Sequence, residues 1–313
     1  MLPTPSSVVT STEAVIDGLG APFSMRRLLA YPLRKASAQL ERNPRWPVLH
    51  LPLSLGAEFG LSSTLSAGLA SACLLLYGFA DLTDDAQDGD LQGDWGWERA
   101  VNAGFTLSFL GQEVLLGLDV PLPQQVRLGR GFAEAGRRMT FGQEGDLRAA
   151  FPDVPSVEEY LATITGKTGA SVAYFAGIAA IAARRPEETI RRLMTYGESL
   201  GAYHQIMSDL ADIRAPWGSG SDVRNRKLTL PILYGLSQDP SGRVRAWLEG
   251  NEPDLAVAEE LERLGAPIYC RMKAQIFRRK ALAQLDGLGL SSGVATDLRG
   301  YLSAQGPASM LEL

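Results

Sequence analysis

Residues 61–88 read LSSTLSAGLASACLLLYGFADLTDDAQD, a long apolar run that ends in a cluster of carboxylates. Its apolar residues recur at three- and four-residue spacing, which is typical of one face of an α-helix. The same spacing continues through most of the chain, whereas convincing alternating segments with Asn-Gly or Asp-Gly hairpins between them are absent. The sequence therefore predicts an all-α fold.

Ten helices are expected, and some of their ends have a chemical reason. Ser156 followed by Glu159 forms a capping box that starts one helix, and Pro186 at a first helical position starts another. Residues 214–222 form a Gly/Ser-rich break of the kind that often closes over substrates. The expected helices cover residues 26–41, 61–87, 98–116, 123–149, 156–183, 186–211, 228–236, 254–264, 266–285 and 293–305.

Length and composition indicate an ordinary globular protein with a large core, since 45% of the 313 residues are hydrophobic and 21% are charged. Residues 1–20 are expected to form a loose leader without the features of a signal peptide, and residues 21–313 a single domain. The net charge of −5 gives no general attraction to nucleic acid or anionic membranes, so any basic site must be local.

The apolar stretches 61–80 and 170–183 are interrupted by Ser, Thr, Gly and Tyr. This favours buried helices over membrane spans, so no stable membrane insertion is expected. Cys73 and Cys270 are the only cysteines, and each lies in an apolar or helical stretch. Unpaired thiols of this kind favour a reducing compartment, so we expect a cytoplasmic protein.

The carboxylates at the end of the quoted run indicate a metal site. Asp84 and Asp88 lie four residues apart, so they share one helix face, with Asp85 beside them. Like charges at the C-terminal end of a helix, where the dipole is also negative, oppose helix stability unless a cation neutralises them. The spacing does not match an EF-hand loop, and oxygen ligands with room left for phosphate suit Mg²⁺. For this run alone, the alternative is a solvated acidic helix end.

A second polar stripe strengthens the metal interpretation. Gln205, Ser208, Asp209 and Asp212 lie at i, i+3, i+4 and i+7 on one face of an otherwise apolar helix. A polar face among packed helices needs partners, which a facing acidic cluster with shared cations would supply. Two acidic faces with basic residues nearby suggest a clamp for a diphosphate.

The segments around these residues resemble, in order and spacing, the motifs of the trans-isoprenyl diphosphate synthase (polyprenyl synthetase) family. Residues 84–88 match its DDxxD motif, and residues 205–212 lie where the family carries its second motif. The remaining matches are GQEGDL at 142–147 with GQxxDL, EEY at 158–160 with KTG at 167–169, and residues 222–231 with D…KxTxP. The resemblance implies an isoprenoid-synthase-type helical bundle with a central apolar cavity.

The resemblance also implies a reaction, the Mg²⁺-dependent ionisation of an allylic isoprenoid diphosphate with transfer of the prenyl group. Metal and lysine together withdraw electron density, so C–O cleavage leaves an allylic cation and neutralised pyrophosphate. The implied Mg²⁺ ligands are Asp84, Asp85, Asp88, Ser208, Asp209 and Asp212. The implied catalytic residues are Lys167, Thr168 and Gln205, and the implied substrate-binding residues are Phe79, Gln143, Lys167, Arg224, Arg226 and Lys227.

Two further expectations follow from the family alone. Phe79, five residues before the first motif, is expected to limit chain length and to favour a substrate with 15 to 20 carbon atoms. The family resemblance also implies a homodimer.

Several positions depart from the family pattern. Its early GGKRxRP segment, which binds isopentenyl diphosphate, falls near residues 41–47, where only the proline and scattered arginines remain. Residues 89–97 lack the paired arginines, Gly218 occupies another lysine position, and Ser208 replaces the first Asp of the second motif. A second diphosphate needs basic partners of its own, so these losses bear on chain elongation in particular.

Three interpretations therefore stay open: a prenyltransferase with an acceptor of its own, a class I terpene synthase that cyclises the same diphosphate, and a non-catalytic regulatory subunit of a synthase. Retention of the acidic cluster with Lys167 and Lys227 argues against the third, because a scaffold has no reason to keep uncompensated charge.

The tryptophans and histidines carry two interpretations each. Trp46, Trp95 and Trp97 either shape an apolar, cation-stabilising surface or pack at loop junctions. His50 and His204 are too few and too far apart for a metal site. His204, next to Gln205, is better explained as a packing residue than as a base near the cation.

Overall fold

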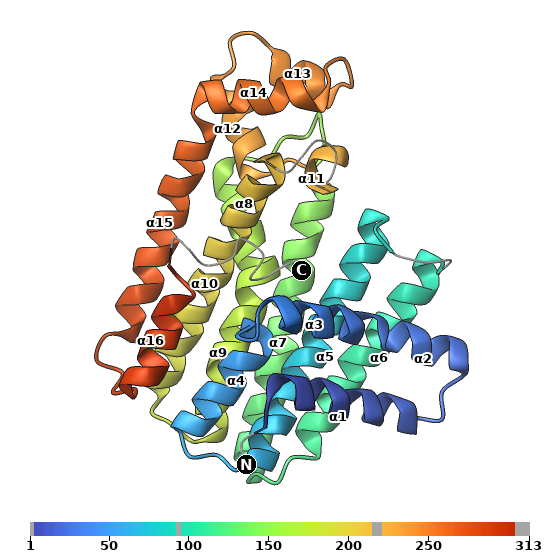
Figure 1. Ribbon diagram of the computed structural model, residues 1–313, viewed down its shortest axis with the longest axis vertical. Helices are drawn as coiled ribbons and strands as arrows, with labels where there is room; N and C mark the ends of the chain where they lie inside the picture. Colours follow the sequence, from blue (N-terminus) through green and yellow to red (C-terminus); the bar gives the residue numbers. More distant parts are fainter. Residues whose placement is uncertain (1–2, 92–94, 215–220, 304–313) are drawn as a thin grey trace.

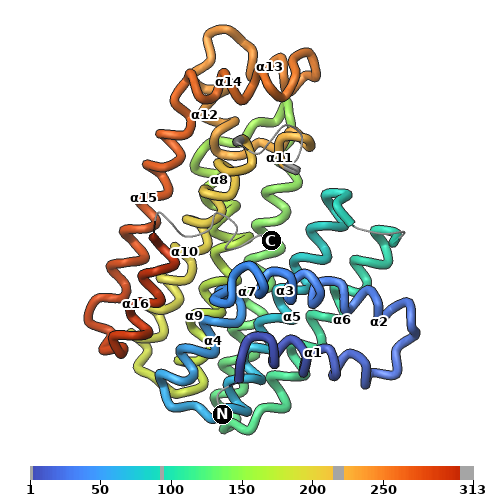
Figure 2. The backbone as a smooth tube through the Cα atoms, in the orientation of Figure 1, coloured from blue at the N-terminus to red at the C-terminus, as the bar shows by residue number. Residues whose placement is uncertain are grey.

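The computed structural model describes residues 3–91, 95–214 and 221–303, and within these ranges the fold consists of helices without a β-strand. Long helices run along the molecule, and the short N-terminal helices lie across them (Figure 1, Figure 2). The all-α prediction is confirmed. The helices are α1 (Pro5–Gly18), α2 (Phe23–Leu29), α3 (Tyr31–Arg42), α4 (Pro47–Glu58), α5 (Ser63–Asp88), α6 (Trp97–Leu116), α7 (Leu122–Arg148), α8 (Val157–Ile164), the π-helical turn η1 (Thr165–Gly169), α9 (Ala170–Ala182), α10 (Glu187–Arg214), α11 (Ser221–Arg224), α12 (Leu230–Gln238), α13 (Arg243–Leu248), α14 (Asp254–Leu264), α15 (Ala266–Leu285) and α16 (Ser292–Gly300).

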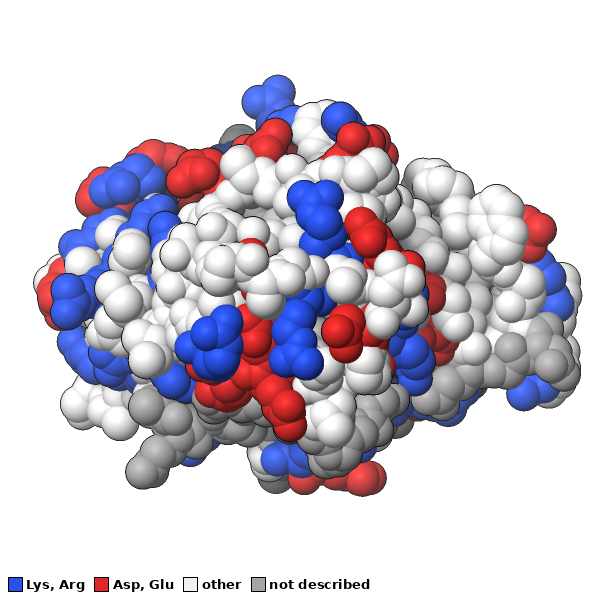
Figure 3. Space-filling view, turned by 90° about the horizontal axis from the view of Figure 1, so that it is seen from above, with Lys and Arg blue, Asp and Glu red and all other residues white. Residues whose placement is uncertain are grey.

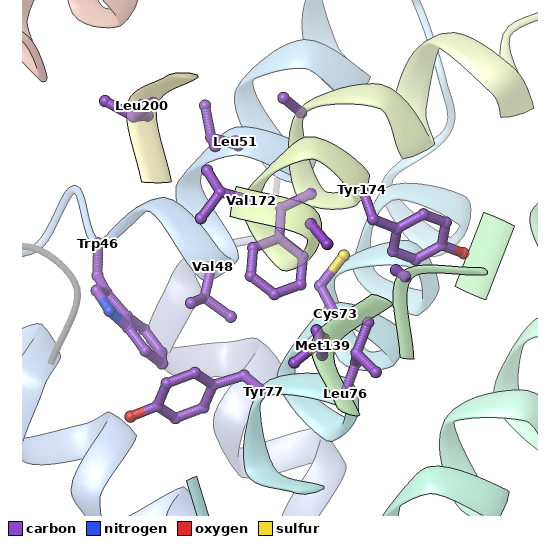
Figure 4. Packing of buried hydrophobic residues seen from close by; sticks show 14 of the residues in the cluster. Trp46, Val48, Leu51, Cys73, Leu76, Tyr77, Met139, Val172, Tyr174 and Leu200 are labelled. Atoms are coloured by element: carbon purple, nitrogen blue, oxygen red, sulfur yellow. The ribbon is translucent and has the colours of Figure 1, made fainter. Parts of the chain in front are cut away.

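The centre of the bundle is formed around α5, α9 and α10. α5 packs against α4 and α6, and α10 packs against α9 and α15. α9 is apolar all round and buried along its whole length, as expected of a helix enclosed by others. Figure 4 shows part of this core, in which the rings of Trp46 and Tyr77 meet edge to face with centroids 4.7 Å apart.

Local chemistry sets both ends of α5. The Ser62 hydroxyl accepts a hydrogen bond from the Leu65 backbone N–H and caps the start of the helix. Gly89 ends the helix in the left-handed conformation, with a φ of 76°, which glycine adopts without a steric penalty. Asp84 and Asp88 therefore lie in the last two turns of a helix whose remainder is anchored in the core.

The N-terminus differs from the loose leader that was expected over residues 1–20. Pro5–Gly18 form α1, which packs against α3, α4 and α5 and buries apolar side chains such as Ile16. A capping box starts this helix, because the side chains of Thr4 and Ser7 each accept a hydrogen bond from the other's backbone N–H. Thr4 and Ser7 thus cap this helix, Thr10 and Ser11 are exposed on it, and Thr12 is buried against the bundle.

Other helices also differ from the expected pattern. α4 and α13 were not expected, and α4 carries Pro47 in its first turn and Pro52 in its interior. The helix expected over residues 26–41 is divided into α2 and α3, because Pro32 fits only the first turn of a helix. The helix expected over residues 156–183 is interrupted by η1, where the backbone widens into a π-helical turn.

Parts of two predictions lie outside the described residues. They are most of the break over residues 214–222, with Gly218, and the end of the helix expected over residues 293–305. The described part of that last helix is α16. The single domain expected over residues 21–313 stays a prediction.

One described helix is long and apolar enough to cross a membrane by length and composition alone. This helix is α5, and 67% of its most apolar window is buried inside the bundle. The core helix of a large bundle can have the same composition, and the carboxylates at the end of α5 line a polar cavity.

Candidate active site

A polar cavity of about 290 Å³ lies between the C-terminal ends of α5 and α10. The structure brings both acidic stripes to this one space, together with two lysines. The lining polar residues are Asp84, Asp85, Asp88, Asp90, Asp146, Tyr160, Thr163, Lys167, Gln205, Ser208, Asp209, Asp212, Asp222, Lys227 and Thr229.

Lys167 joins the first acidic stripe to α7. Its Nζ lies 2.9 Å from Asp84 Oδ1 and 2.7 Å from Asp146 Oδ2. Gln143 Nε2 also donates to Asp84 Oδ1, over 2.8 Å. Burial alone would lower the pKa of Lys167, but the two carboxylates outweigh burial and raise that pKa above its usual value. The ammonium group is therefore charged, and two carboxylates hold it at the edge of the cavity.

Close backbone packing places Lys167 there. η1 packs against α7, and Gly142 lies at the contact. A Cβ added at Gly142 would lie only 2.1 Å from the Lys167 backbone nitrogen, so this contact requires glycine. Single π-helical turns of this kind redirect the side chains that follow and are frequent at functional sites.

A chain of hydrogen bonds orders the second acidic stripe. Thr168 Oγ1 donates to Gln205 Oε1 over 2.8 Å, and Gln205 Nε2 donates to Asp209 Oδ1 over 2.9 Å. The Tyr160 hydroxyl donates to Asp209 Oδ2. Burial raises the pKa of Asp209 to about 6 in spite of these donors. A cation in the cavity would favour the charged form of this carboxylate.

Lys227 reaches the first stripe from the segment before α12. Its Nζ lies 2.5 Å from Asp88 Oδ2 and 3.6 Å from Asp222 Oδ1. The backbone N–H groups of Asp222 and Val223 both donate to Asp212 Oδ2, at 3.0 and 3.3 Å. Asp212 at the end of α10 thereby anchors α11, the short helix that precedes Lys227.

Asp85 lines the cavity, and Lys35 of α3 balances its negative charge. Its Oδ2 accepts hydrogen bonds from the Tyr31 hydroxyl over 2.8 Å and from Lys35 Nζ over 2.9 Å. Lys35 Nζ also lies 2.7 Å from Asp81 Oδ1. Asp81 is fully buried one turn before Asp85, and burial raises its pKa to about 6. Asp85 is therefore bound by side chains of α3, whereas Asp84 is bound by Lys167 and Gln143.

The two candidate arginines are not among the described residues that line the polar cavity. Arg224 lies 3.4 Å from Asp90 Oδ1 and is exposed. The guanidinium of Arg226 lies beside Gly250. Arg224 is therefore an exposed residue beside Asp90, which lines the polar cavity, whereas Arg226 lies at Gly250.

An apolar cavity of about 250 Å³ adjoins the polar one, and the two share Asp84 and Lys167 in their walls. Phe79 lies in the apolar wall, where a residue that limits chain length is expected. The other apolar residues that line this cavity are Ala80, Val101, Phe105, Met139 and Leu147. A charged head and an apolar tail would fit side by side, with their boundary at the two shared residues.

Sequence reasoning did not assign roles to Asp146, Tyr160 or Asp222, although all three stand inside the quoted motifs. Asp146 lies three residues after Gln143, so helix geometry alone places both on one side of α7. The partner of Tyr160, Asp209, is 49 positions away, and no local pattern signals such a contact.

Whether a divalent cation fits the polar cavity depends on which side-chain atoms could coordinate it. Within the described ranges, no group of three His, Cys, Asp or Glu side chains converges in a metal-binding geometry. The cavity nevertheless offers eight aspartates against two lysines, and it has no His or Cys among its described lining residues. Burial raises the pKa of Asp88 and of Asp212, because it disfavours their charged forms, and a cation would favour those charged forms. Hard oxygen donors with excess negative charge fit a cation such as Mg²⁺.

The tryptophans and histidines lie outside the described lining of the polar cavity. His50 Nδ1 lies 2.6 Å from the Tyr301 hydroxyl. His204 packs on the Tyr203 ring, and burial lowers its pKa to about 4, as expected of a neutral packing residue. Trp46 is buried in the core, Trp95 lies under the guanidinium groups of Arg27 and Arg99, and Trp97 is exposed.

Comparison with known proteins identifies the family. Residues 90–263 match the family model of polyprenyl synthetase. The (2E,6E)-farnesyl diphosphate synthase of Mycobacterium tuberculosis is 28% identical over 251 residues, which cover 72% of this chain and 68% of that protein. Heptaprenyl diphosphate synthase component 2 of Geobacillus stearothermophilus is 27% identical over 270 residues, which cover 79% of this chain and 82% of that protein.

Solved structures have the same fold. The polyprenyl synthetase from Streptomyces coelicolor superposes with a TM-score of 0.79 at 24% identity, over 95% of this chain and 96% of that one. The geranylgeranyl pyrophosphate synthetase from Pyrococcus horikoshii gives a TM-score of 0.80 at 22% identity, over 95% and 94% of the two chains. These superpositions confirm the helical bundle, and the family model covers more than half of the sequence. The chain therefore belongs to the polyprenyl synthetase family.

Proposed function

We propose that this protein ionises an allylic isoprenoid diphosphate in a Mg²⁺-dependent reaction and transfers the prenyl group to an acceptor. The observation that carries the proposal is the junction of a polar and an apolar cavity at Asp84 and Lys167. Relatives named farnesyl, nonaprenyl and geranylgeranyl diphosphate synthase support the same class of reaction.

Lys167 and Lys227 would hold the diphosphate. In the free protein each ammonium group lies between two carboxylates. Each can exchange one carboxylate for a phosphate oxygen while it keeps the other, so the lysine does not have to be reordered when substrate binds. Positive charge that is fixed in place before the reaction stabilises the negative charge that develops on the leaving pyrophosphate.

The apolar cavity would hold the prenyl chain and keep water from the allylic cation. Phe79 and Met139 lie in its wall. Gln205 lines the polar cavity, and hydrogen bonds to the buried Thr168 and to Asp209 fix the direction of its amide. Exclusion of water favours transfer of the prenyl group over hydrolysis. A substrate with 15 to 20 carbon atoms is part of this proposal.

Mg²⁺ would be held between the two acidic stripes. Asp84 and Asp88 would supply oxygens from α5, and Asp209 and Asp212 from α10, with Asp85 and Ser208 beside them. When bound, the ion supplies Lewis-acid stabilisation of the departing pyrophosphate.

The acceptor site that we propose is a separate cavity on α3. It has a volume of about 510 Å³, and Arg34, Lys35 and Arg42 line it together with Tyr31 and Tyr77. Lys35 connects this cavity to Asp85 of the first stripe. Its three cations fit an anionic acceptor.

The test is incubation of the purified protein with allylic diphosphates of 10, 15 and 20 carbon atoms and Mg²⁺, with isopentenyl diphosphate present or omitted. Products are identified by mass spectrometry, and pyrophosphate release is followed in parallel. We expect pyrophosphate release with the 15- or 20-carbon substrate and a longer diphosphate when isopentenyl diphosphate is present. Absence of turnover in every mixture would overturn the proposal.

A second candidate function is class I cyclisation of the same diphosphate. It is favoured by the segment over residues 41–47, where the family binds isopentenyl diphosphate. Trp46 of this segment is buried in the core, and Arg45 Nη1 pairs with Asp297 Oδ1 at 2.7 Å. Among the described residues of this segment, only Arg42 lines the α3 cavity. A hydrocarbon that forms without isopentenyl diphosphate would select cyclisation.

We also propose a cytoplasmic homodimer that associates through α6 and α7. Its support is an exposed apolar face formed by Phe105, Phe109, Leu116, Leu122, Val126 and Phe141. A group of exposed large apolar side chains on neighbouring helices is typical of a subunit interface. The cytoplasmic location is supported by two free, buried cysteines. One relative is named as a component of heptaprenyl diphosphate synthase, so a different second subunit is the alternative.

A further inference from the structure

α15 carries an exposed apolar stripe. Ile268, Met272 and Ile276 follow one another at i, i+4 and i+8, so their side chains line one face of the helix. They are 63%, 64% and 62% exposed, respectively. Single exposed hydrophobic residues are normal on a protein surface, but an aligned group on one helix face indicates a contact surface.

Basic residues border this stripe. α15 contains Arg271, Lys273, Arg278, Arg279 and Lys280 and no acidic residue, in a chain with a net charge of −5. At 100° per residue, Arg271 lies on one side of the stripe and Lys280 on the other, while Arg279 extends it toward the end of the helix. The apolar stripe and its cationic border belong to one surface.

Part of this positive charge has no close salt-bridge partner among the residues that the structure describes. Lys280 Nζ lies 3.8 Å from Glu198 Oε2, a loose pair in which the lysine is half exposed. Arg271 and Arg279 are exposed, and neither forms a salt bridge within the described ranges. Their charges are therefore free to attract an anionic partner.

The position of α15 leaves this surface open. Its buried side packs against α10, α12 and α14, and α15 forms one long edge of the molecule (Figure 1, Figure 2). Seen from above, Lys and Arg side chains predominate along the left edge, the side on which α15 lies in Figure 1 (Figure 3). The apolar face of α6 and α7 lies on other helices, so the proposed homodimer would not cover this one.

We propose that this face of α15 docks the protein reversibly on a membrane of anionic phospholipids. A helix that lies in the membrane plane buries its apolar side chains at the boundary of headgroups and acyl chains, while flanking lysines and arginines attract anionic headgroups. A second copy of the same face is a poorer partner, because the unpaired arginines of the two copies would repel each other. The inference does not depend on the proposed catalytic function.

The test is sedimentation of the full-length protein with vesicles of phosphatidylcholine alone or mixed with an equal amount of phosphatidylglycerol. We expect binding to the mixed vesicles that weakens with added salt, and much weaker binding to the neutral ones. The double variant R271Q/R279Q should bind the mixed vesicles about 30-fold more weakly, since each basic side chain near the surface contributes about one kcal/mol. The triple variant I268S/M272S/I276S should lose at least about tenfold.

The matched control is R26Q/R27Q, which removes the same charge from α2 on the other side of the molecule (Figure 1). It should bind the vesicles like the wild type, and all variants should keep wild-type turnover without vesicles. Wild-type protein that stays in the supernatant with mixed vesicles would overturn the proposal. So would α15 variants that bind like the control, or that change the oligomeric state instead of vesicle binding. Vesicle binding by a protein without turnover would leave this inference standing and refute the proposed function alone.

Discussion

Replacing Gly142 with alanine puts a methyl group into the tightest contact between α7 and η1. The added Cβ would lie 2.1 Å from the Lys167 backbone nitrogen and 2.7 Å from the Lys167 Cα, and neither backbone atom can rotate away. The two elements must therefore separate by at least about 1 Å to reach an ordinary contact distance. A shift of this size at a catalytic group lowers turnover about 100-fold. The overpacking should also cost about 1–3 kcal/mol of unfolding free energy.

Gly129→Ala is the matched control in the same helix, because a Cβ added there has nothing within 4 Å. It should gain up to about 1 kcal/mol of unfolding free energy, since alanine is the better helix former, and keep its turnover. Urea unfolding and pyrophosphate release from 15- and 20-carbon allylic diphosphates measure both effects. If Gly142→Ala unfolds and turns over like the wild type, the packing of η1 on α7 does not position Lys167.

Three further predictions address the second stripe, a buried histidine and the proposed interface. Tyr160→Phe removes the hydroxyl that donates to Asp209, so the Mg²⁺ concentration for half-maximal turnover should rise about 10- to 100-fold, and an unchanged value would count against this role. Burial lowers the pKa of His204 to about 4 in the folded protein, whereas a histidine in the unfolded chain has a pKa near 6.5. As the pH falls, the unfolded chain therefore binds a proton on this histidine before the folded protein does. The wild type should therefore lose about 2 kcal/mol more unfolding free energy than His204→Phe between about pH 6.5 and pH 5, and equal losses measured by urea unfolding would contradict the assignment. Phe109→Glu places a charge on the exposed face of α6 and should give a monomer by sedimentation velocity, whereas an unchanged dimer would put the interface elsewhere.

Helix geometry accounts for what the sequence predicted about the site. α14 and α15 begin and end where the apolar pattern indicated. The spacing of Asp84 with Asp88 and of Gln205 with Asp209 predicted that each pair shares a helix face, because this depends only on the rotation per residue. That the two faces meet was inferred from the need of a buried polar stripe for partners and from the family resemblance, since no local rule places the end of α5 opposite the end of α10.

The contacts across the cavity could not be predicted from local patterns. Lys227 and Asp88 are 139 positions apart, and the packing of α11 and α12 against α10 brings Lys227 to the cavity that Asp88 also lines. α4 was not predicted, and it contains two prolines, which are unfavourable in a helix interior. Pro47 in fact fits the first turn of a helix, and burial of the leucines around Pro52 offsets the hydrogen bond that its missing N–H cannot make.

The central claim is that carboxylates from α5 and α10 bind pyrophosphate through shared Mg²⁺. Calorimetric titration of pyrophosphate into the protein, with and without Mg²⁺, tests it most directly. We predict that the wild type and the surface control D17N/D119N bind pyrophosphate only with Mg²⁺, and that D84N/D88N does not bind it. Equal binding by the wild type without Mg²⁺, or unchanged binding by D84N/D88N with Mg²⁺, would contradict the claim.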